Sequence, residues 1–257
     1  MKIGYSSMKR LCLSLLFGGI MLSFEVLAGV TLISDPKVLS IPVHENNDAW
    51  VDLRAQKTIV IGPSLEILNN QDYTYLRKMV YEKLKLAQSK LPKGYHFCLY
   101  EGYRSLALQK MLFDKQYHNV KTRHPDWKEK DIFMETTKLV SPVINPDNTP
   151  NIPPHSTGAA IDVYLIDDKG EVIDMGIHPK DWMLDNDGHL SETVSSAISD
   201  TAKQNRNVMN KALIAAGFVN YPTEYWHWSY RDRYWAYVKK HNYAIYGNTV
   251  SPTAITN

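Results

Sequence analysis

The chain has 257 residues and a net charge of +2, with 44% hydrophobic and 22% charged residues. This balance is typical of a soluble globular protein and gives no reason to expect a nucleic-acid partner. A chain of this length can bury a sizeable core without disulfides. The two cysteines, Cys12 and Cys98, are too few for a disulfide framework or for a zinc site built from several thiolates.

The start of the chain has the layout of a secretory signal peptide. Lys2, Lys9 and Arg10 precede an apolar run, residues 11–24, and Val26-Leu27-Ala28 offers small residues to a signal peptidase. The run has about 14 residues, fewer than the roughly 20 that span a membrane comfortably. An uncleaved N-terminal anchor is the alternative interpretation.

If this segment is removed on export, the chain consists of a signal peptide and a mature protein. Residues 1–28 are the expected signal peptide, and residues 29–257 are the expected single domain, located in the periplasm or secreted. No long apolar run follows Ala28. We therefore expect no stable membrane span once the signal peptide has been removed.

The expected elements of the first half alternate between strands and helices. Short β-branched or aromatic runs predict strands, and apolar residues at helical spacing predict helices. In chain order these are a strand at residues 58–61, a helix through residues 76–87, a strand at residues 95–100 and a helix at residues 106–117. Several prolines mark residues 140–154 as a loop.

The second half contains the longest expected helix and most of the expected sheet. We expect a strand at residues 159–166, a turn and a returning strand to residue 175, a helix at residues 194–216, and strands at residues 218–221 and 225–230. The helix should end at Gly217, a favoured C-terminal cap. This order predicts an α+β fold in one domain, with a small antiparallel sheet flanked by helices.

Two short segments carry residues suited to a catalytic zinc site, which needs three protein ligands and an open position for water. His155 follows the proline-rich loop, and Asp162 lies in the strand after it. Glu224 and His227 lie in an aromatic run, where a regular strand would send them to opposite faces. They can share a site only if Glu224 lies in the turn after Pro222. Taken alone, the first segment is also explained by a loop histidine and a strand-edge carboxylate, and the second by an aromatic strand with a chance histidine.

Together the two segments resemble the zinc D,D-peptidase family, whose motifs are written SxHxxGxAxD and ExWH. His155, Gly158, Ala160 and Asp162 match the first motif in register, and Glu-Tyr-Trp-His at residues 224–227 matches the second. Three further stretches resemble the D-alanyl-D-alanine dipeptidase branch, which includes the vancomycin-resistance dipeptidase. They are Glu-Gly-Tyr-Arg-Ser at 101–105, Asp-Met-Gly at 174–176, and Asn205-Arg206 followed by Gly217-Phe218.

The resemblance implies a role for each candidate residue. His155, Asp162 and His227 would bind zinc at the sheet, one ion per chain. Glu224 would act as the general acid and base. Arg104 would stabilise the oxygen on which negative charge develops.

Two departures from the family pattern concern substrate recognition. Pro153 stands where the family has a serine that helps to hold the substrate carboxylate, and proline has no hydroxyl group. The carboxylate that would bind the substrate ammonium is expected to be Asp181, although one extra residue precedes it. The metal site therefore follows the family pattern more closely than the substrate site does.

We interpret the chain as a zinc metallopeptidase that hydrolyses D-Ala-D-Ala, or a related D-amino-acid dipeptide, in cell-wall peptide metabolism. The expected partner is a small D-amino-acid peptide. One alternative is a D,D- or L,D-carboxypeptidase that trims peptidoglycan stem peptides. Another is a non-catalytic cell-wall-binding module, against which Glu224 argues because binding needs no general base.

Overall fold

The computed structural model describes residues 29–63, 71–248 and 252, so the expected signal peptide lies outside the described residues. Its framework is a two-stranded sheet, β1-β3, and a five-stranded sheet in the order β2-β4-β5-β7-β6. The strands are β1 (Trp50–Asp52), β2 (Val60–Ile61), β3 (Tyr75–Arg77), β4 (His96–Glu101), β5 (Ala160–Ile166), β6 (Val219–Tyr221) and β7 (Glu224–Ser229).

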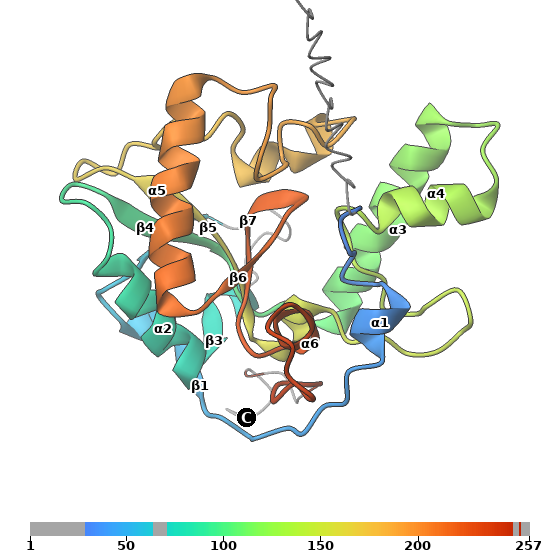
Figure 1. Ribbon diagram of the computed structural model, residues 1–257, viewed down its shortest axis with the longest axis horizontal. Coiled ribbons are helices and arrows are strands. Elements are labelled where there is room, and N and C mark those ends of the chain that lie inside the picture. The colour runs from blue at the N-terminus through green and yellow to red at the C-terminus, as the bar shows by residue number, and fades with distance from the viewer. Residues whose placement is uncertain (1–28, 64–70, 249–251, 253–257) are drawn as a thin grey trace, which may run out of the picture.

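Helices flank the larger sheet. In Figure 1, α2 and α5 lie together on one side of the molecule, and α3 and α4 lie together on the other. The α-helices are α1 (Pro36–Leu39), α2 (Lys78–Gln88), α3 (Leu106–Arg123), α4 (Glu129–Thr136), α5 (Asp200–Ala216) and α6 (Arg233–Val238). Short 3-10 helices are η1 (Leu53–Ala55), η2 (Asp72–Thr74), η3 (Pro154–Thr157) and η4 (Pro179–Leu184). Within the described ranges, no helix is both long enough and apolar enough to cross a membrane.

The central strand β5 is buried along its whole length. Its side chains alternate between the two faces of the sheet, and the two faces have different surroundings. Ile161, Val163 and Leu165 belong to the main core, which also contains the apolar residues of α2 and α5. Asp162 and Tyr164 point to the opposite face. The strand therefore carries a carboxylate on the face away from the main core.

Gly158 joins η3 to β5 in a left-handed conformation, with φ at 72°. A Cβ atom at this position would lie 2.2 Å from a ring atom of Trp50. Trp50 cannot easily withdraw, because the Arg77 guanidinium packs over its ring at 4.6 Å and donates a hydrogen bond to the Thr157 carbonyl at 2.9 Å. The glycine thus allows the chain to turn sharply between the two residues that are the first candidate ligands.

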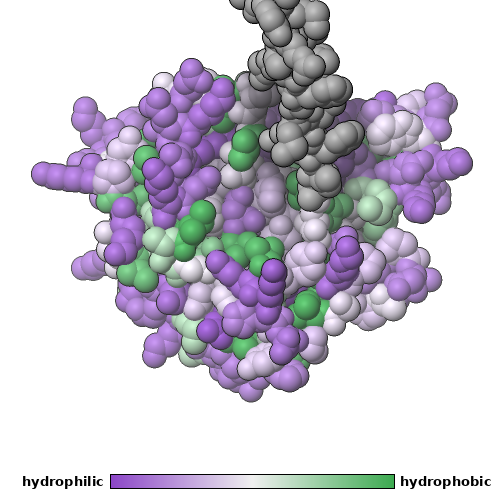
Figure 2. Space-filling model, in the orientation of Figure 1, coloured by the Kyte–Doolittle hydropathy of each residue, from purple (hydrophilic) through white to green (hydrophobic). Residues whose placement is uncertain are grey.

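The structure confirms the α+β single-domain fold with helices around the sheet. One edge departs from the expectation, because β2 pairs with β4 in parallel. The surface is mixed: hydrophilic side chains cover most of the face in Figure 2, and hydrophobic ones form small separate groups.

Two expected elements are shorter in the structure than the sequence predicted. The returning strand at residues 171–175 is reduced to a single bridge between Ile166 and Val172, because Asp174 accepts a hydrogen bond from the Gly176 N–H and turns the chain. The long helix begins at Asp200 instead of residue 194, because Ser199 caps it by accepting a hydrogen bond from the Ala202 N–H at 3.0 Å.

Candidate active site

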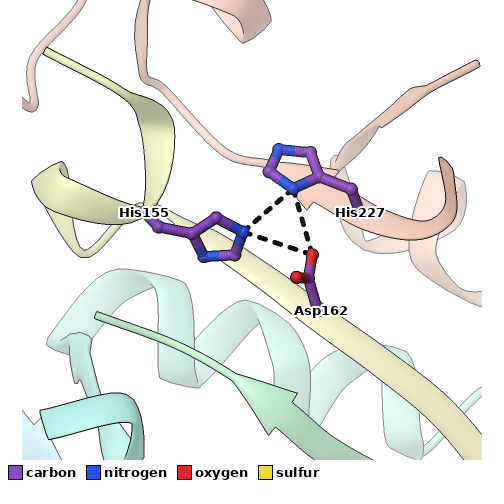
Figure 3. Close-up of side chains that lie close together, drawn as sticks. All are labelled: His155, Asp162 and His227. Atoms are coloured by element: carbon purple, nitrogen blue, oxygen red, sulfur yellow. Dashed lines mark hydrogen bonds and ion pairs between the residues drawn. The ribbon is translucent and has the colours of Figure 1, made fainter. Parts of the chain in front are cut away.

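Three side chains from different elements converge on the face of the sheet away from the main core (Figure 3). His155 lies in η3, while Asp162 on β5 and His227 on β7 are direct cross-strand partners. The Nε2 atom of His155 lies 3.0 Å from Nδ1 of His227, and the Asp162 Oδ1 atom lies 3.2 Å and 3.0 Å from these two nitrogens. All three residues are buried.

This triangle fits a tetrahedral metal ion. With bonds of about 2.0 Å, two corners of a zinc tetrahedron are roughly 3.3 Å apart, close to the three distances observed. The Nδ1 atom of His155 lies 2.8 Å from the Gly102 carbonyl oxygen, to which it donates as N–H. That bond leaves the Nε2 lone pair of His155 directed at the site, the arrangement usual for a metal-bound histidine.

The charge states of His155 and Asp162 also suit a cation. Burial lowers the pKa of His155 to about 4, so its imidazole is neutral at pH 7 and can donate a lone pair. Burial by itself would raise the pKa of Asp162, but His155 and His227 outweigh it and hold that pKa below the usual range. The site therefore offers a cation the neutral nitrogen of His155 and the negative oxygen of Asp162.

Glu224 and His227 reach the same site because the pairing of β6 with β7 is irregular. Asn220 pairs with Trp228, but the next residue, Tyr221, pairs with Glu224 instead of His227. The Asn220 side chain stabilises this bulge by donating hydrogen bonds of 3.0 Å to the carbonyls of both Glu224 and His227. Glu224 is thus the first residue of β7, and not only a turn residue.

The Glu224 carboxylate lies beside the triangle and outside it. Its Oε2 atom is 3.9 Å from Nδ1 of His227, and the residue is 7% exposed. Burial raises its pKa well above the ordinary value, the Asp162 charge adds to the rise, and Arg104 opposes it. A carboxylate with a raised pKa next to an open metal position is suited to accept and return a proton.

Arg104 lies next to the triangle, with its Nη2 atom 4.0 Å from Oδ2 of Asp162. Its Nη1 atom donates a 3.0 Å hydrogen bond to the Gln109 side-chain oxygen. Gln109 is in turn fixed, because its amide donates to the Ser141 carbonyl at 2.7 Å. The backbone N–H of Arg104 donates to the His155 carbonyl at 3.2 Å, which joins the main chains that carry these two residues.

The ligand triangle, Glu224 and Arg104 line one pocket, which we call the active-site pocket. Its walls come from β4, α3, the segment after α4, η3, β5, η4, β6 and β7. Candidate residues in the lining are Arg104, His155, Asp162, Glu224 and His227. Sequence reasoning did not single out several other lining residues: Ile33, Gln109, Ser141, Trp182 and Tyr221.

Asp181 is the one candidate that does not line this pocket. It lies in η4, between Pro179 and Trp182, which both line the pocket. Burial lowers the pKa of the neighbouring His178, and the negative charge of Asp181 partly offsets this lowering. The assignment of Asp181 to substrate binding stays a prediction. Pro153, by contrast, does line the pocket. The serine hydroxyl of the family pattern is therefore absent from the pocket itself.

Comparison with known proteins agrees with this geometry. A family model described as D-ala-D-ala dipeptidase, peptidase M15, matches residues 59–245. The D-alanyl-D-alanine dipeptidase of Synechocystis sp. (strain ATCC 27184 / PCC 6803 / Kazusa) is 26% identical over 223 residues, covering 77% of this chain and 88% of the relative. The D-alanyl-D-alanine dipeptidase of Escherichia coli (strain K12) is 33% identical over 73 residues, covering 28% of this chain and 35% of the relative.

A solved structure, VanYB in complex with D-Alanine-D-Alanine, is similar over 79% of this chain and 93% of that chain, with 15% identity and a TM-score of 0.39. The family match is the stronger finding, because it spans more than half of the chain and includes the whole ligand triangle. The chain therefore belongs to the D-alanyl-D-alanine dipeptidase family, and it is a zinc metallopeptidase.

Proposed function

We propose that the chain hydrolyses D-Ala-D-Ala, or a related D-amino-acid dipeptide, in cell-wall peptide metabolism. The observation that carries the proposal is the placement of the buried Glu224 carboxylate and the Arg104 guanidinium beside one ligand triangle, in one pocket. A binding module would gain nothing from a buried, desolvated carboxylate at this position. The two relatives reported above are both named D-alanyl-D-alanine dipeptidase.

The reaction follows from the positions of the side chains. His155, Asp162 and His227 would hold the zinc ion, which when bound lowers the pKa of a water toward about 7 and polarises the scissile carbonyl. Glu224 accepts the proton of the attacking water and passes it to the leaving amine. Arg104 donates hydrogen bonds to the oxygen on which negative charge develops, and Gln109 keeps the guanidinium aimed at it.

A dipeptidase must also recognise a free ammonium group, which would be costly to bury without a carboxylate partner. We therefore expect cleavage of D-Ala-D-Ala and weak or no cleavage of its N-acetylated form. Asp181→Asn should reduce this preference, whereas Asp187→Asn, an exposed carboxylate on the following turn, should leave it unchanged. Steady-state kinetics on the free dipeptide, the acetylated dipeptide and a stem pentapeptide measure the preference directly.

The same assay decides between the two enzymatic alternatives. Better cleavage of the acetylated dipeptide or the pentapeptide than of the free dipeptide would replace the dipeptidase by a carboxypeptidase. A zinc-loaded protein that cleaves none of the three substrates would favour the non-catalytic module.

Export is a second part of the proposal, supported by the basic start, the short apolar run and the small residues before Gly29. We expect residues 1–28 to be removed and the mature enzyme to act in the periplasm or outside the cell. N-terminal sequencing of the exported protein should begin at Gly29. Material that begins at Met1 or Met8 would contradict this expectation.

A further inference from the structure

The first residues of the described chain form a wall of the active-site pocket. Ile33 lines this pocket together with Tyr221 and the catalytic candidates, and it is only 7% exposed. The two preceding apolar residues, Val30 and Leu32, face a different space. We call residues 30–33 the N-terminal wall.

The space on the other side of this wall is a groove between α3, the end of α4 and the loop before α5. We call it the side groove, and six of the residues that line it are Val30, Leu32, Lys138, Leu139, Asn186 and Glu192. Leu139 lines the active-site pocket as well, so the pocket and the groove are neighbours. Consecutive residues of the N-terminal wall, Leu32 and Ile33, therefore face the groove and the pocket respectively.

Hydrogen bonds hold the wall in this position. The Tyr221 hydroxyl accepts a hydrogen bond from the backbone N–H of Ile33 and lies 3.5 Å from the Thr137 carbonyl, to which it donates. The carbonyl of Leu32 accepts from the Asp35 N–H at 2.9 Å, which closes the turn that leads into α1. The wall is thus tied to β6 through Tyr221, which is tied in turn to the segment that follows α4.

From this placement we infer that the N-terminal wall limits the length of the substrate, with Ile33 as the specificity-determining residue. The inference rests on the proposed dipeptidase function and adds its structural cause. The wall separates the active-site pocket from the side groove, so a peptide longer than the pocket meets the Ile33 side chain. If that side chain is shortened, an additional residue can extend toward the groove.

The test uses the zinc-loaded mature protein with D-Ala-D-Ala and its extended form, tri-D-alanine. Ile33→Ala should raise the ratio of kcat/KM for the tripeptide over that for the dipeptide by about tenfold, the effect that one or two methylenes have in a specificity pocket. Ile33→Phe should narrow the pocket and lower kcat/KM for the dipeptide about tenfold, with zinc retained. Val194→Ala, a control that shortens an exposed side chain lining neither the pocket nor the groove, should leave the dipeptide kinetics unchanged.

The pair of Ile33 variants separates a pocket wall from a residue that only stabilises the fold, because loss of stability alone would impair both substrates in the same proportion. An unchanged substrate ratio in Ile33→Ala, or unchanged dipeptide kinetics in Ile33→Phe, would overturn the inference while the dipeptidase function stands. A wild-type enzyme that cleaves the tripeptide better than the dipeptide would overturn both.

Discussion

Glu224→Ala should abolish nearly all hydrolysis while the protein keeps its zinc. A positioned general acid and base is worth about 10²- to 10⁴-fold in rate, and the 3.9 Å separation from Nδ1 of His227 places Glu224 beside the ligands instead of among them. Single-turnover rates on D-Ala-D-Ala and metal analysis of the same sample give the two readouts. Glu224→Gln keeps the shape of the side chain and should show the same loss of rate.

The matched control is Glu171→Ala, which removes an exposed carboxylate on the turn after β5. It should keep both the rate and the zinc content. Two results would contradict the role of Glu224: a Glu224→Ala enzyme that retains most of its activity, or one that loses the metal, which would make Glu224 a ligand.

Removal of either histidine should have the second large effect. His155→Ala and His227→Ala each leave two of the three ligands, so metal affinity should fall by more than the ~10–100-fold that an outer-shell partner contributes. We expect about one zinc per chain in the wild-type protein. Both variants should contain little zinc after dialysis against a weak chelator, and their activity should fall to background.

His178→Ala is the control for these variants. This histidine is half-buried and packs against Tyr164 with ring centroids 4.5 Å apart, but it is not part of the ligand triangle. It should keep its zinc. Full zinc occupancy in both ligand variants would exclude the assigned site.

The sequence predicted the ligand triangle because its residues lie in two compact motifs with fixed spacing. It could not explain how Glu224 and His227 share a face, because that depends on the irregular pairing of β6 with β7. The pairing is stabilised by the Asn220 side chain, and Asn220 precedes the motif without belonging to it. A polar residue between two strands carries no specific signal before the strands have been paired.

The parts of the fold that escaped prediction depend on tertiary contacts. The strands β1 and β3 have three residues each, too short for a periodicity. Gln109 could have been found, since a polar residue beside Leu108 on the buried side of an expected helix needs a partner. Ile33 could not, because nothing in an isolated isoleucine near the start of a chain indicates which cavity it closes.

The cross-strand pairing of Asp162 with His227 has a consequence for folding. A slip of one residue between β5 and β7 would turn one of these side chains to the opposite face of the sheet, and the metal would lose a ligand. The ion thus binds only the correctly paired strands and stabilises them over the slipped alternatives by mass action. A metal ion bound here would therefore favour one alignment of the sheet, in addition to its part in the reaction.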